Sequence, residues 1–229
     1  MTGIAETGGA AALRVLITRG APAGWRWISS ILHGKSVVVL GPPAAGKTTF
    51  VRFLERGVFL PESPHERTRR LTDSRRFQVD IGRGQNFTLH ISRVTDIPGQ
   101  DADPAEYVAN LRPQGMVLVL DWSSIETQTE GVDWLDDFLL RLDQLFLAAP
   151  RKARFRTVMV LLNKVDKIQF DTGDSKTLVK ARVDAGMRTA RGTDLQHVTV
   201  RDCCLVDNPR GLILAETVVA DLAIRLTEN

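Results

Sequence analysis

Apolar residues along this chain form short runs and longer periodic stretches, and the two kinds alternate. Strands are expected at 35–40, 75–81, 86–94, 116–121, 157–162 and 197–204. Helices are expected at 48–54, 104–111, 132–147, 176–190 and 212–226. Because the turn residues 82–85 join the second and third strands as a hairpin, one antiparallel edge strand is predicted on an otherwise parallel sheet. The alternation predicts an α/β fold.

The longest periodic stretch, 132–147, carries an apolar stripe. Its members are Leu135, Phe138, Leu139, Leu142 and Phe146, at helical spacing. Such a stripe is most often part of the core, so we expect this helix to be packed on that side.

A glycine-rich loop follows the first expected strand. Residues 41–48 read Gly-Pro-Pro-Ala-Ala-Gly-Lys-Thr and match the phosphate-loop pattern G-x-x-x-x-G-K-[ST] between a strand and a helix. The prolines precede the N–H groups of 44–49, which can therefore cradle phosphates at the helix start. Lys47 is expected to reach the β- and γ-phosphates, and the Thr48 hydroxyl to ligate Mg²⁺. The residues expected to bind the nucleotide here are Gly41, Ala44, Ala45, Gly46, Lys47, Thr48 and Thr49.

A second motif, Asn163-Lys164-Val165-Asp166, ends the strand expected at 157–162. A phosphate loop by itself leaves ATPases, kinases and GTPases open, whereas N-K-x-D at the end of a strand is the pattern that selects a guanine base. An aspartate that accepts from guanine N–H groups finds no such donors on adenine, so ATP would leave a buried charge unpaired. Together the two motifs predict a guanine-nucleotide-binding protein.

A third motif lies at 94–100, where the chain reads Val-Thr-Asp-Ile-Pro-Gly-Gln. Asp96, at the end of a strand, can hold Mg²⁺, usually through a water. Gly99 lets the backbone approach the γ-phosphate, and Gln100 is positioned to orient an attacking water.

In this order and at these separations, the three motifs resemble those of the Ras-like small GTPases, and the stretch 96–101 is also similar to the Arf-like branch. The resemblance covers residues 35–227. It implies a three-layer α/β domain of the P-loop GTPase class, with a six-stranded, mostly parallel sheet and helices on both faces. It also implies GTP hydrolysis to GDP and phosphate with Mg²⁺, and two switch segments that respond to the γ-phosphate and engage a protein effector or regulator.

The resemblance also implies how guanine is held. Asn163 and Asp166 would hydrogen-bond the guanine edge, with the stem of Lys164 lying over the ring. A backbone contact to the guanine carbonyl is expected in 203–207, at Cys204, although the family's Ser-Ala-Lys letters are absent there. Backbone contacts tolerate such changes of side chain.

The first switch of the family contributes a threonine that meets Mg²⁺ and the γ-phosphate. Thr68 and Thr72 are both candidates, and Thr72 is preferred because it stands just before the strand at 75–81. Arg69 stands three residues before Thr72, the spacing at which heterotrimeric G-protein α subunits carry a catalytic arginine. One hypothesis is that Arg69, or Arg70, stabilises the charge of the transition state. The alternative is a solvated basic segment that binds a partner.

Length and charge agree with one compact domain. The chain has 229 residues, 43% of them hydrophobic, and a net charge of +3 without a long run of one sign, so binding to nucleic acid is not expected. The two cysteines, Cys203 and Cys204, are adjacent, which suits neither a disulfide framework nor a metal site. We expect core thiols in a reducing cytoplasm. No apolar run has the length of a membrane span, and no signal peptide is expected.

Residues 1–34 precede the domain expected at 35–229. Residues 25–32 can form a short amphipathic helix with Trp25, Ile28 and Leu32 on one side. That helix could pack on its own domain, dock a partner or lie at a membrane interface. Thr2 stands where myristoylation needs glycine, and 226–229 offers no prenylation cysteine, so membrane contact is expected to be at most weak or through a partner.

Function is left between two classes. The first is a switch enzyme that binds GTP, engages a partner and is reset by a water oriented by Gln100. The second is a module that holds guanine nucleotide structurally and hydrolyses it negligibly. The intact Gln100 favours the first class, and the irregular first switch leaves room for the second. A P-loop kinase or ATPase would require the match at 163–166 to be coincidental.

Overall fold

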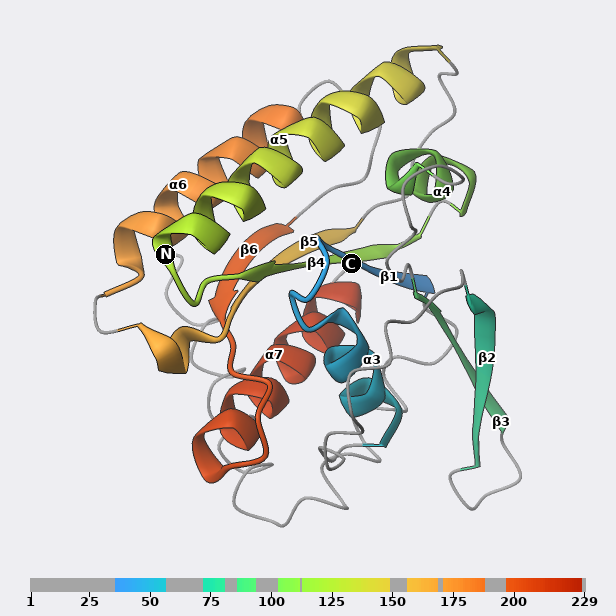
Figure 1. The fold of residues 1–229 in the computed structure, drawn as a ribbon. Coiled ribbons are helices and arrows are strands. Elements are labelled where there is room, and N and C mark those ends of the chain that lie inside the picture. The colour runs from blue at the N-terminus through green and yellow to red at the C-terminus, as the bar shows by residue number, and fades with distance from the viewer. Residues whose placement is uncertain are drawn as a thin grey trace, which may run out of the picture.

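The computed structural model describes residues 36–56, 72–80, 86–93, 103–111, 113–148, 156–168, 171–187 and 197–227. Their strands form one sheet with helices on both sides (Figure 1). The strands are β1 (Ser36–Leu40), β2 (Thr72–Asp80), β3 (Asn86–Arg93), β4 (Gly115–Asp121), β5 (Thr157–Asn163) and β6 (His197–Asp202). The helices are α3 (Lys47–Arg56), α4 (Pro104–Leu111), α5 (Ile125–Ala148), α6 (Gly173–Gly186) and α7 (Pro209–Thr227), with a short 3₁₀ helix η1 (Val165–Lys167).

The sheet has the strand order β2-β3-β1-β4-β5-β6. β1 pairs in parallel with β3 and β4, β4 with β5, and β5 with β6, whereas β2 pairs antiparallel with β3 at one edge. Parallel neighbours need crossover connections, which the helices provide. The predicted α/β fold, a parallel sheet covered by helices, is confirmed.

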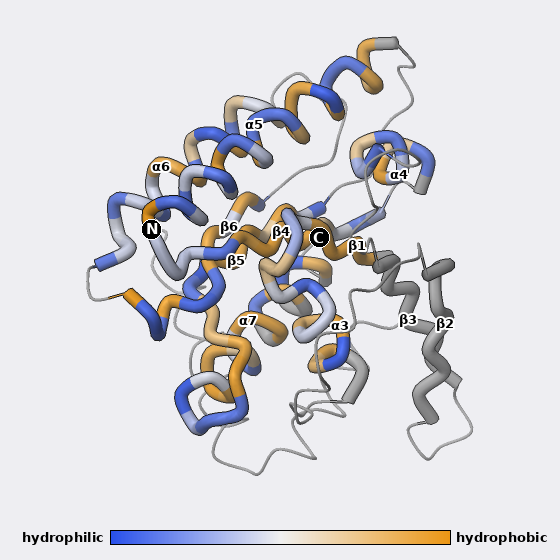
Figure 2. The backbone as a smooth tube through the Cα atoms, viewed as in Figure 1, coloured by the Kyte–Doolittle hydropathy of each residue, from blue (hydrophilic) through white to orange (hydrophobic). Residues whose placement is uncertain are grey.

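Successive residues of the central strands point to opposite faces, and each face has its own apolar core. In β1, Val37 and Val39 join a cluster with α3 and α7, while Val38 and Leu40 join a cluster with α4, α5 and α6. Figure 1 shows these two groups of helices on opposite sides of the sheet, and Figure 2 shows the apolar strands between them. β4 and β5 are buried along their whole length, as strands covered on both faces should be.

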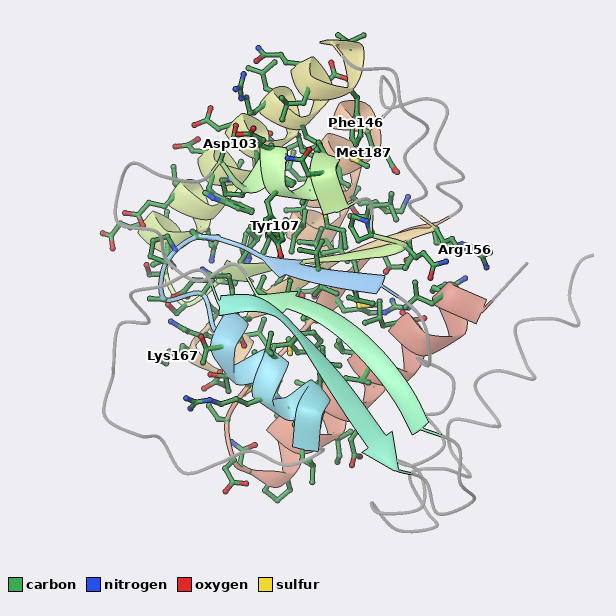
Figure 3. All side chains as sticks on the ribbon, turned by 90° about the vertical axis from the view of Figure 1, so that its right-hand side faces the viewer. Asp103, Tyr107, Phe146, Arg156, Lys167 and Met187 are labelled. Carbon is green, nitrogen blue, oxygen red and sulfur yellow. The ribbon has the colours of Figure 1, made fainter. Side chains whose placement is uncertain are left out.

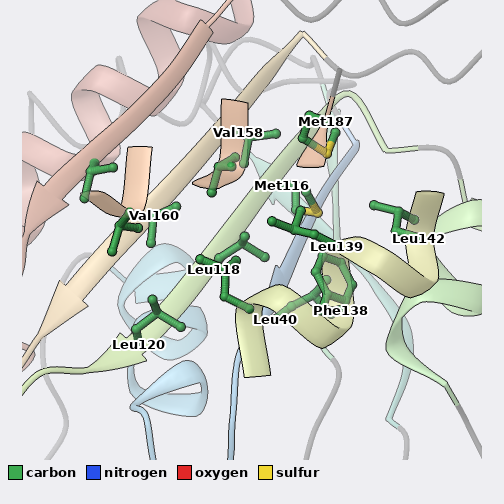
Figure 4. Packing of buried hydrophobic residues seen from close by; sticks show 14 of the residues in the cluster. Leu40, Met116, Leu118, Leu120, Phe138, Leu139, Leu142, Val158, Val160 and Met187 are labelled. Atoms are coloured by element: carbon green, nitrogen blue, oxygen red, sulfur yellow. The ribbon is translucent and has the colours of Figure 1, made fainter. Parts of the chain in front are cut away.

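The apolar stripe predicted on the longest helix lies in the second of these cores. Leu135, Phe138, Leu139 and Leu142 are buried, and the partly buried Phe146 packs against the same cluster. Figure 4 shows Phe138 and Leu139 of α5 beside Met116 of β4. The prediction that this stripe belongs to the core is confirmed.

The boundaries predicted from apolar spacing are wrong for the helices α5 and α6. α5 begins at Ile125 rather than at 132, because Ser124 and Thr127 cap it. The Thr127 N–H donates to Ser124 Oγ (3.2 Å), and the Ser124 N–H donates to Thr127 Oγ1 (3.1 Å). α6 begins at Gly173 rather than at 176, where the Gly173 N–H donates to the carboxylate of Asp171 (3.2 Å), and it ends at Gly186 rather than at 190. Glycine is a weak helix former, which suits an end at that position.

Other boundaries shift at the edge where the strands end. β6 ends at Asp202 rather than at Cys204, because the Cys203 carbonyl turns to accept from the Val165 N–H (3.4 Å). β2 begins at Thr72 rather than at 75, with an irregular register between these positions. Both cysteine side chains are buried, as predicted for core thiols.

In the part of the chain that the structure describes, no helix combines the length and the apolar character that a membrane crossing requires. Residues 1–34, with the helix expected at 25–32, lie outside the described residues.

Candidate functional site

The predicted site residues that the structure describes gather where the carboxyl ends of β1, β4, β5 and β6 meet. We call this side of the sheet the candidate edge; it is distinct from the edge strand β2. Ligands of open α/β sheets bind outside the carboxyl ends of the strands. Figure 3 shows Arg156, before β5, and Lys167, after it, at opposite ends of the sheet, with Lys167 at the candidate edge.

The loop between β1 and α3 requires glycine at both ends. Gly41 has φ +149°, and a Cβ there would lie 2.0 Å from the Val119 carbonyl oxygen. Gly46 has φ +102°, and a Cβ there would lie 2.4 Å from Nδ2 of Asn163. Ala44, between them, also has a positive φ of 58°. The two glycines therefore let the loop pass close to the ends of β4 and β5.

Lys47 is the first residue of α3 and is only 7% exposed. Its ammonium donates to the carbonyls of Gly41 (2.7 Å) and Pro42 (2.5 Å), so the side chain spans the loop. Thr48 and Thr49 follow in the first turn, where backbone N–H groups and the helix dipole favour an anion. The glycine loop, the lysine and the start of α3 thus lie together, as an anion site at a helix N-terminus would require.

Asn163 connects this loop to the rest of the edge. It is the last residue of β5 and 2% exposed. Its Nδ2 donates to the Ala45 carbonyl (2.8 Å), its Oδ1 accepts from the Leu205 N–H (3.1 Å), and its own carbonyl accepts from the Trp122 N–H (2.9 Å). One side chain and its backbone thus hold together the loops after β1, β4 and β6.

Lys164 follows with a left-handed backbone, φ 63°. Its ammonium forms an ion pair with Asp121, the last residue of β4. The other oxygen of Asp121 accepts from the Ser123 N–H (3.0 Å) and Ser123 Oγ (2.6 Å). Burial by itself would raise the pKa of Asp121, but the hydrogen bonds from Lys164 and Ser123 outweigh it and hold the pKa below its ordinary value. The carboxylate therefore stays ionised at neutral pH.

Sequence patterns did not single out Asp121. A carboxylate that ends a fully buried apolar strand is unusual, because such a charge needs a partner. That position, at the same edge as Asn163, is the feature that could have identified it.

Asp166 lies in η1 with an exposed side chain, close to Cys204. Burial and a hydrogen bond from the Cys204 thiol to the Asp166 carboxylate raise the pKa of Cys204 to about 11. The thiol is therefore a neutral donor at physiological pH. The structure thus brings together two residues that were predicted to contact guanine.

The loop after Cys204 leads into α7, which starts at Pro209 rather than at 212. Asn208 caps this helix: its Oδ1 accepts from the Gly211 N–H (2.7 Å), and its carbonyl accepts from the Leu212 N–H (2.9 Å). At Gly211 an added Cβ would lie 2.3 Å from the Val206 carbonyl oxygen. The helix cap therefore fixes the path of the loop that carries Leu205.

Thr72 is placed at the candidate edge by strand register. It pairs with Arg93, the last residue of β3, and Arg93 pairs with Val39 near the end of β1. Two strand spacings, about 10 Å, separate this position from β1. Its backbone therefore lies on the side where the phosphate loop begins.

Several predicted residues lie outside the described residues. They are Thr68, Arg69, Arg70, Asp96, Gly99 and Gln100. Within the described ranges there is also no group of three or more His, Cys, Asp or Glu side chains that could hold a metal ion.

A hollow of about 340 Å³ adjoins the same edge, between the start of α6, the end of β6 and the first turns of α7. Its lining consists of Val165, Ile168, Asp171, Thr172, Asp202, Arg210 and Leu214. Of the four motif residues at 163–166, only Val165 borders it, and none of the residues predicted to bind nucleotide does. The hollow is therefore separate from the phosphate loop.

Comparison with known proteins finds similar folds but no matching family. No family model and no curated protein matches the chain. In contrast, 687 chains of known structure resemble it, so the architecture is widespread and selects no function by itself.

One of these is described as the crystal structure of an SsGBP mutation variant. It superposes with a TM-score of 0.50 at 19% sequence identity, over 85% of this chain and 58% of that one. This chain thus corresponds to little more than half the length of that protein. At such low identity the likeness supports the α/β fold and nothing finer.

Proposed function

We propose that this protein is a guanine-nucleotide-binding switch of the Ras-like small GTPase type. It would bind GTP with Mg²⁺, hydrolyse it to GDP and phosphate, and engage a protein partner through its switch segments. In this proposal the six-stranded sheet, with β2 as its antiparallel edge, is the P-loop GTPase form of the α/β fold.

One observation carries the proposal. The amide of Asn163 bonds both the phosphate loop, at the Ala45 carbonyl, and the loop after β6, at the Leu205 N–H. The G-x-x-x-x-G-K-T and N-K-x-D motifs are far apart in the sequence, yet these bonds make them neighbours. A nucleotide with its phosphates on the first motif and its base on the second needs such an arrangement.

The base end of the proposed site, which consists of residues 163–166 and the neighbouring ends of β4 and β6, supplies the groups that guanine recognition requires. Asp166 offers an exposed carboxylate to the N–H groups of guanine, and adenine has no matching donors. Nδ2 of Asn163 has a second proton beyond the one given to Ala45. The stem of Lys164 supplies an apolar surface for the ring.

The phosphate end of the proposed site, residues 41–49, supplies positive charge and hydrogen-bond donors. Lys47 lies across the loop, and the N–H groups of 44–49 line the start of α3. The hydroxyls of Thr48 and Thr72 and the carboxylate of Asp96 are oxygen ligands of the kind that Mg²⁺ prefers, and the first two belong to segments at the same edge. When bound, Mg²⁺ would neutralise charge on the β- and γ-phosphate oxygens.

Hydrolysis is assigned to residues of the switch segments. Gln100 would orient the water that attacks the γ-phosphorus, so that the bond to the β-phosphate oxygen breaks and GDP and phosphate form. Arg69 would stabilise the charge that develops in that transition state. Both roles rest on the sequence motifs.

Single-turnover hydrolysis of GTP and ATP with Mg²⁺ tests the proposal. We expect turnover of GTP only, with base selectivity lost in Asp166→Ala and rate lost in Gln100→Ala. Asp137→Ala, which removes an exposed aspartate on α5, is the matched control and should change neither. Tight GTP binding without turnover would contradict the switch enzyme and favour a module that holds the nucleotide structurally. Equal use of ATP would contradict the proposal.

A further inference from the structure

A carboxylate and a lysine meet directly across two strands at the base end of the site. Asp121 pairs in register with Asn163, and Lys164 is the next residue along the chain. The Asp121 side chain is only 12% exposed and that of Lys164 only 28%. Their ion pair therefore lies within the edge of the sheet, where solvent screens it less than it would on the surface.

The carboxylate is itself fixed on both sides. One oxygen takes the Lys164 ammonium, and the other takes the N–H (3.0 Å) and the hydroxyl (2.6 Å) of Ser123. A lysine side chain normally samples many rotamers, and ordering it costs entropy. Held by a fixed carboxylate, the methylene stem of Lys164 is ordered before any ligand arrives.

We infer that Asp121 is a positioning residue for the nucleotide base: it anchors the Lys164 ammonium so that the lysine stem forms a preset platform for the ring. This inference rests on the proposed function. Preordering of this kind raises affinity because less freedom is lost on binding. An apolar stem contacts the face of a ring and not its edge, so the platform should strengthen the binding of any purine nucleotide by a similar factor.

The same edge contains a matched pair without this role. Asp202, the last residue of β6, forms an ion pair with Lys176 (2.8 Å) and accepts from the Thr172 hydroxyl (2.7 Å). Carboxylate, lysine and hydroxyl repeat the chemistry of Asp121, Lys164 and Ser123. Lys176 belongs to α6, however, and not to the N-K-x-D segment.

A double-mutant cycle on the full chain tests the inference, with GDP as the probe. Asp121→Asn keeps the size and removes the charge, and Lys164→Met keeps an unbranched stem and removes the ammonium. We expect each variant to bind GDP about tenfold more weakly, and the double variant to be no weaker than either. The preference for GDP over ADP should persist in all three, and for GTP the KM should rise while kcat at saturation is held.

Asp202→Asn is the control for general damage to a strand end. It should lower the melting temperature by about as much as Asp121→Asn does, and it should leave the affinity for GDP unchanged. An equal loss of GDP affinity in Asp202→Asn, or additive losses from Asp121→Asn and Lys164→Met, would overturn the positioning role. So would unchanged binding in Asp121→Asn.

Asp166→Ala separates this inference from the proposed function. If Asp166→Ala abolishes the preference for GDP while Asp121→Asn binds GDP normally, only the positioning role fails. If the unaltered protein binds GDP no better than ADP, or does not bind it, the proposed function fails and the positioning role with it. If both are correct, Asp121→Asn binds GDP more weakly, and its loss of affinity is not additive with that of Lys164→Met.

Discussion

The two ends of the candidate site are built in different ways. The phosphate end is local, because Gly41, Gly46 and Lys47 belong to one loop and the lysine ammonium donates to carbonyls of that loop. The base end is assembled from the ends of separate strands: Asp121 closes β4 and Asn163 closes β5, next to the loop after β6. A short motif can therefore specify the phosphate end, whereas the base end depends on the register of the sheet.

Asn163 joins the two ends, and Gly46 leaves the space that its amide occupies. Changes at this junction should damage both ends. Changes on either side of it should damage one end and spare the other.

Gly46→Ala should have the largest effect. The new Cβ would lie 2.4 Å from Nδ2 of Asn163, at a φ of +102° that alanine rarely adopts. We expect the free energy of unfolding to fall by about 4 kcal/mol and nucleotide binding to be lost. Urea denaturation and GDP titration measure both. Gly131→Ala in α5 is the control, because its Cβ would meet no atom closer than 3.6 Å. Equal behaviour of the two variants would refute the close contact at the junction.

Asn163→Ala should come next. It leaves the Ala45 carbonyl and the Leu205 N–H without their partner at a buried position. We expect a loss of about 3 kcal/mol of stability, and weaker binding of both GDP and inorganic tripolyphosphate, since both ends lose support. The exposed Asn110→Ala is the matched control. Normal tripolyphosphate binding by Asn163→Ala would show that the two ends are independent.

Lys47→Met should act on the phosphate end alone. Removing the ammonium should slow GTP hydrolysis about 100-fold, equivalent to about 2.7 kcal/mol. The preference for guanine over adenine should persist, because the groups after β5 are untouched. Single-turnover rates and competition between GDP and ADP check this. A loss of base preference in Lys47→Met would contradict the division into two ends.

The last effect is absent at neutral pH: an alkaline sensitivity that originates at the two buried cysteines. Burial raises the pKa of Cys203 to about 12 and, with a contact to Asp166, that of Cys204 to about 11. The folded protein thus holds the thiol protons more tightly than the unfolded chain, in which the thiols have their ordinary pKa near 9. This contribution to stability is complete below pH 9 and is lost as the pH rises toward 11 and 12.

We therefore expect the free energy of unfolding to fall more steeply between pH 9 and 11 in the unaltered protein than in Cys203→Ala/Cys204→Ala. Denaturant midpoints across that range measure the difference. Parallel curves would mean that the thiols do not contribute.

The sequence predicted the phosphate end of the site more completely than the base end. The tight loop with Gly41, Gly46 and Lys47 could be predicted because its motif is contiguous, and the parallel core strands could be predicted from their apolar runs. The contact between Asp121 and Lys164 could not, because it depends on the pairing of Asp121 with Asn163 across β4 and β5. Nothing within its own strand indicates the partner.

Helix boundaries failed for a related reason. The start of α5 is set by hydrogen bonds between Ser124 and Thr127, and its first turns carry no apolar stripe. The loop after Asp202 leaves the strand because the Cys203 carbonyl bonds the Val165 N–H. Apolar periodicity detects burial, whereas caps and turns depend on individual polar contacts. The roles of all the predicted site residues stay predictions, and Thr68, Arg69, Asp96, Gly99 and Gln100 also lie outside the described residues.

The central claim is that this edge of the sheet selects a guanine nucleotide. Equilibrium titration of the protein with GDP and with ADP, each in the presence of Mg²⁺, tests it most directly. We expect GDP to bind about 100-fold more tightly than ADP, because adenine lacks the N–H donors that guanine offers to the Asp166 carboxylate. Asp166→Ala should remove most of that difference. Equal affinity for GDP and ADP, or a preference for GDP that Asp166→Ala leaves intact, would contradict the claim.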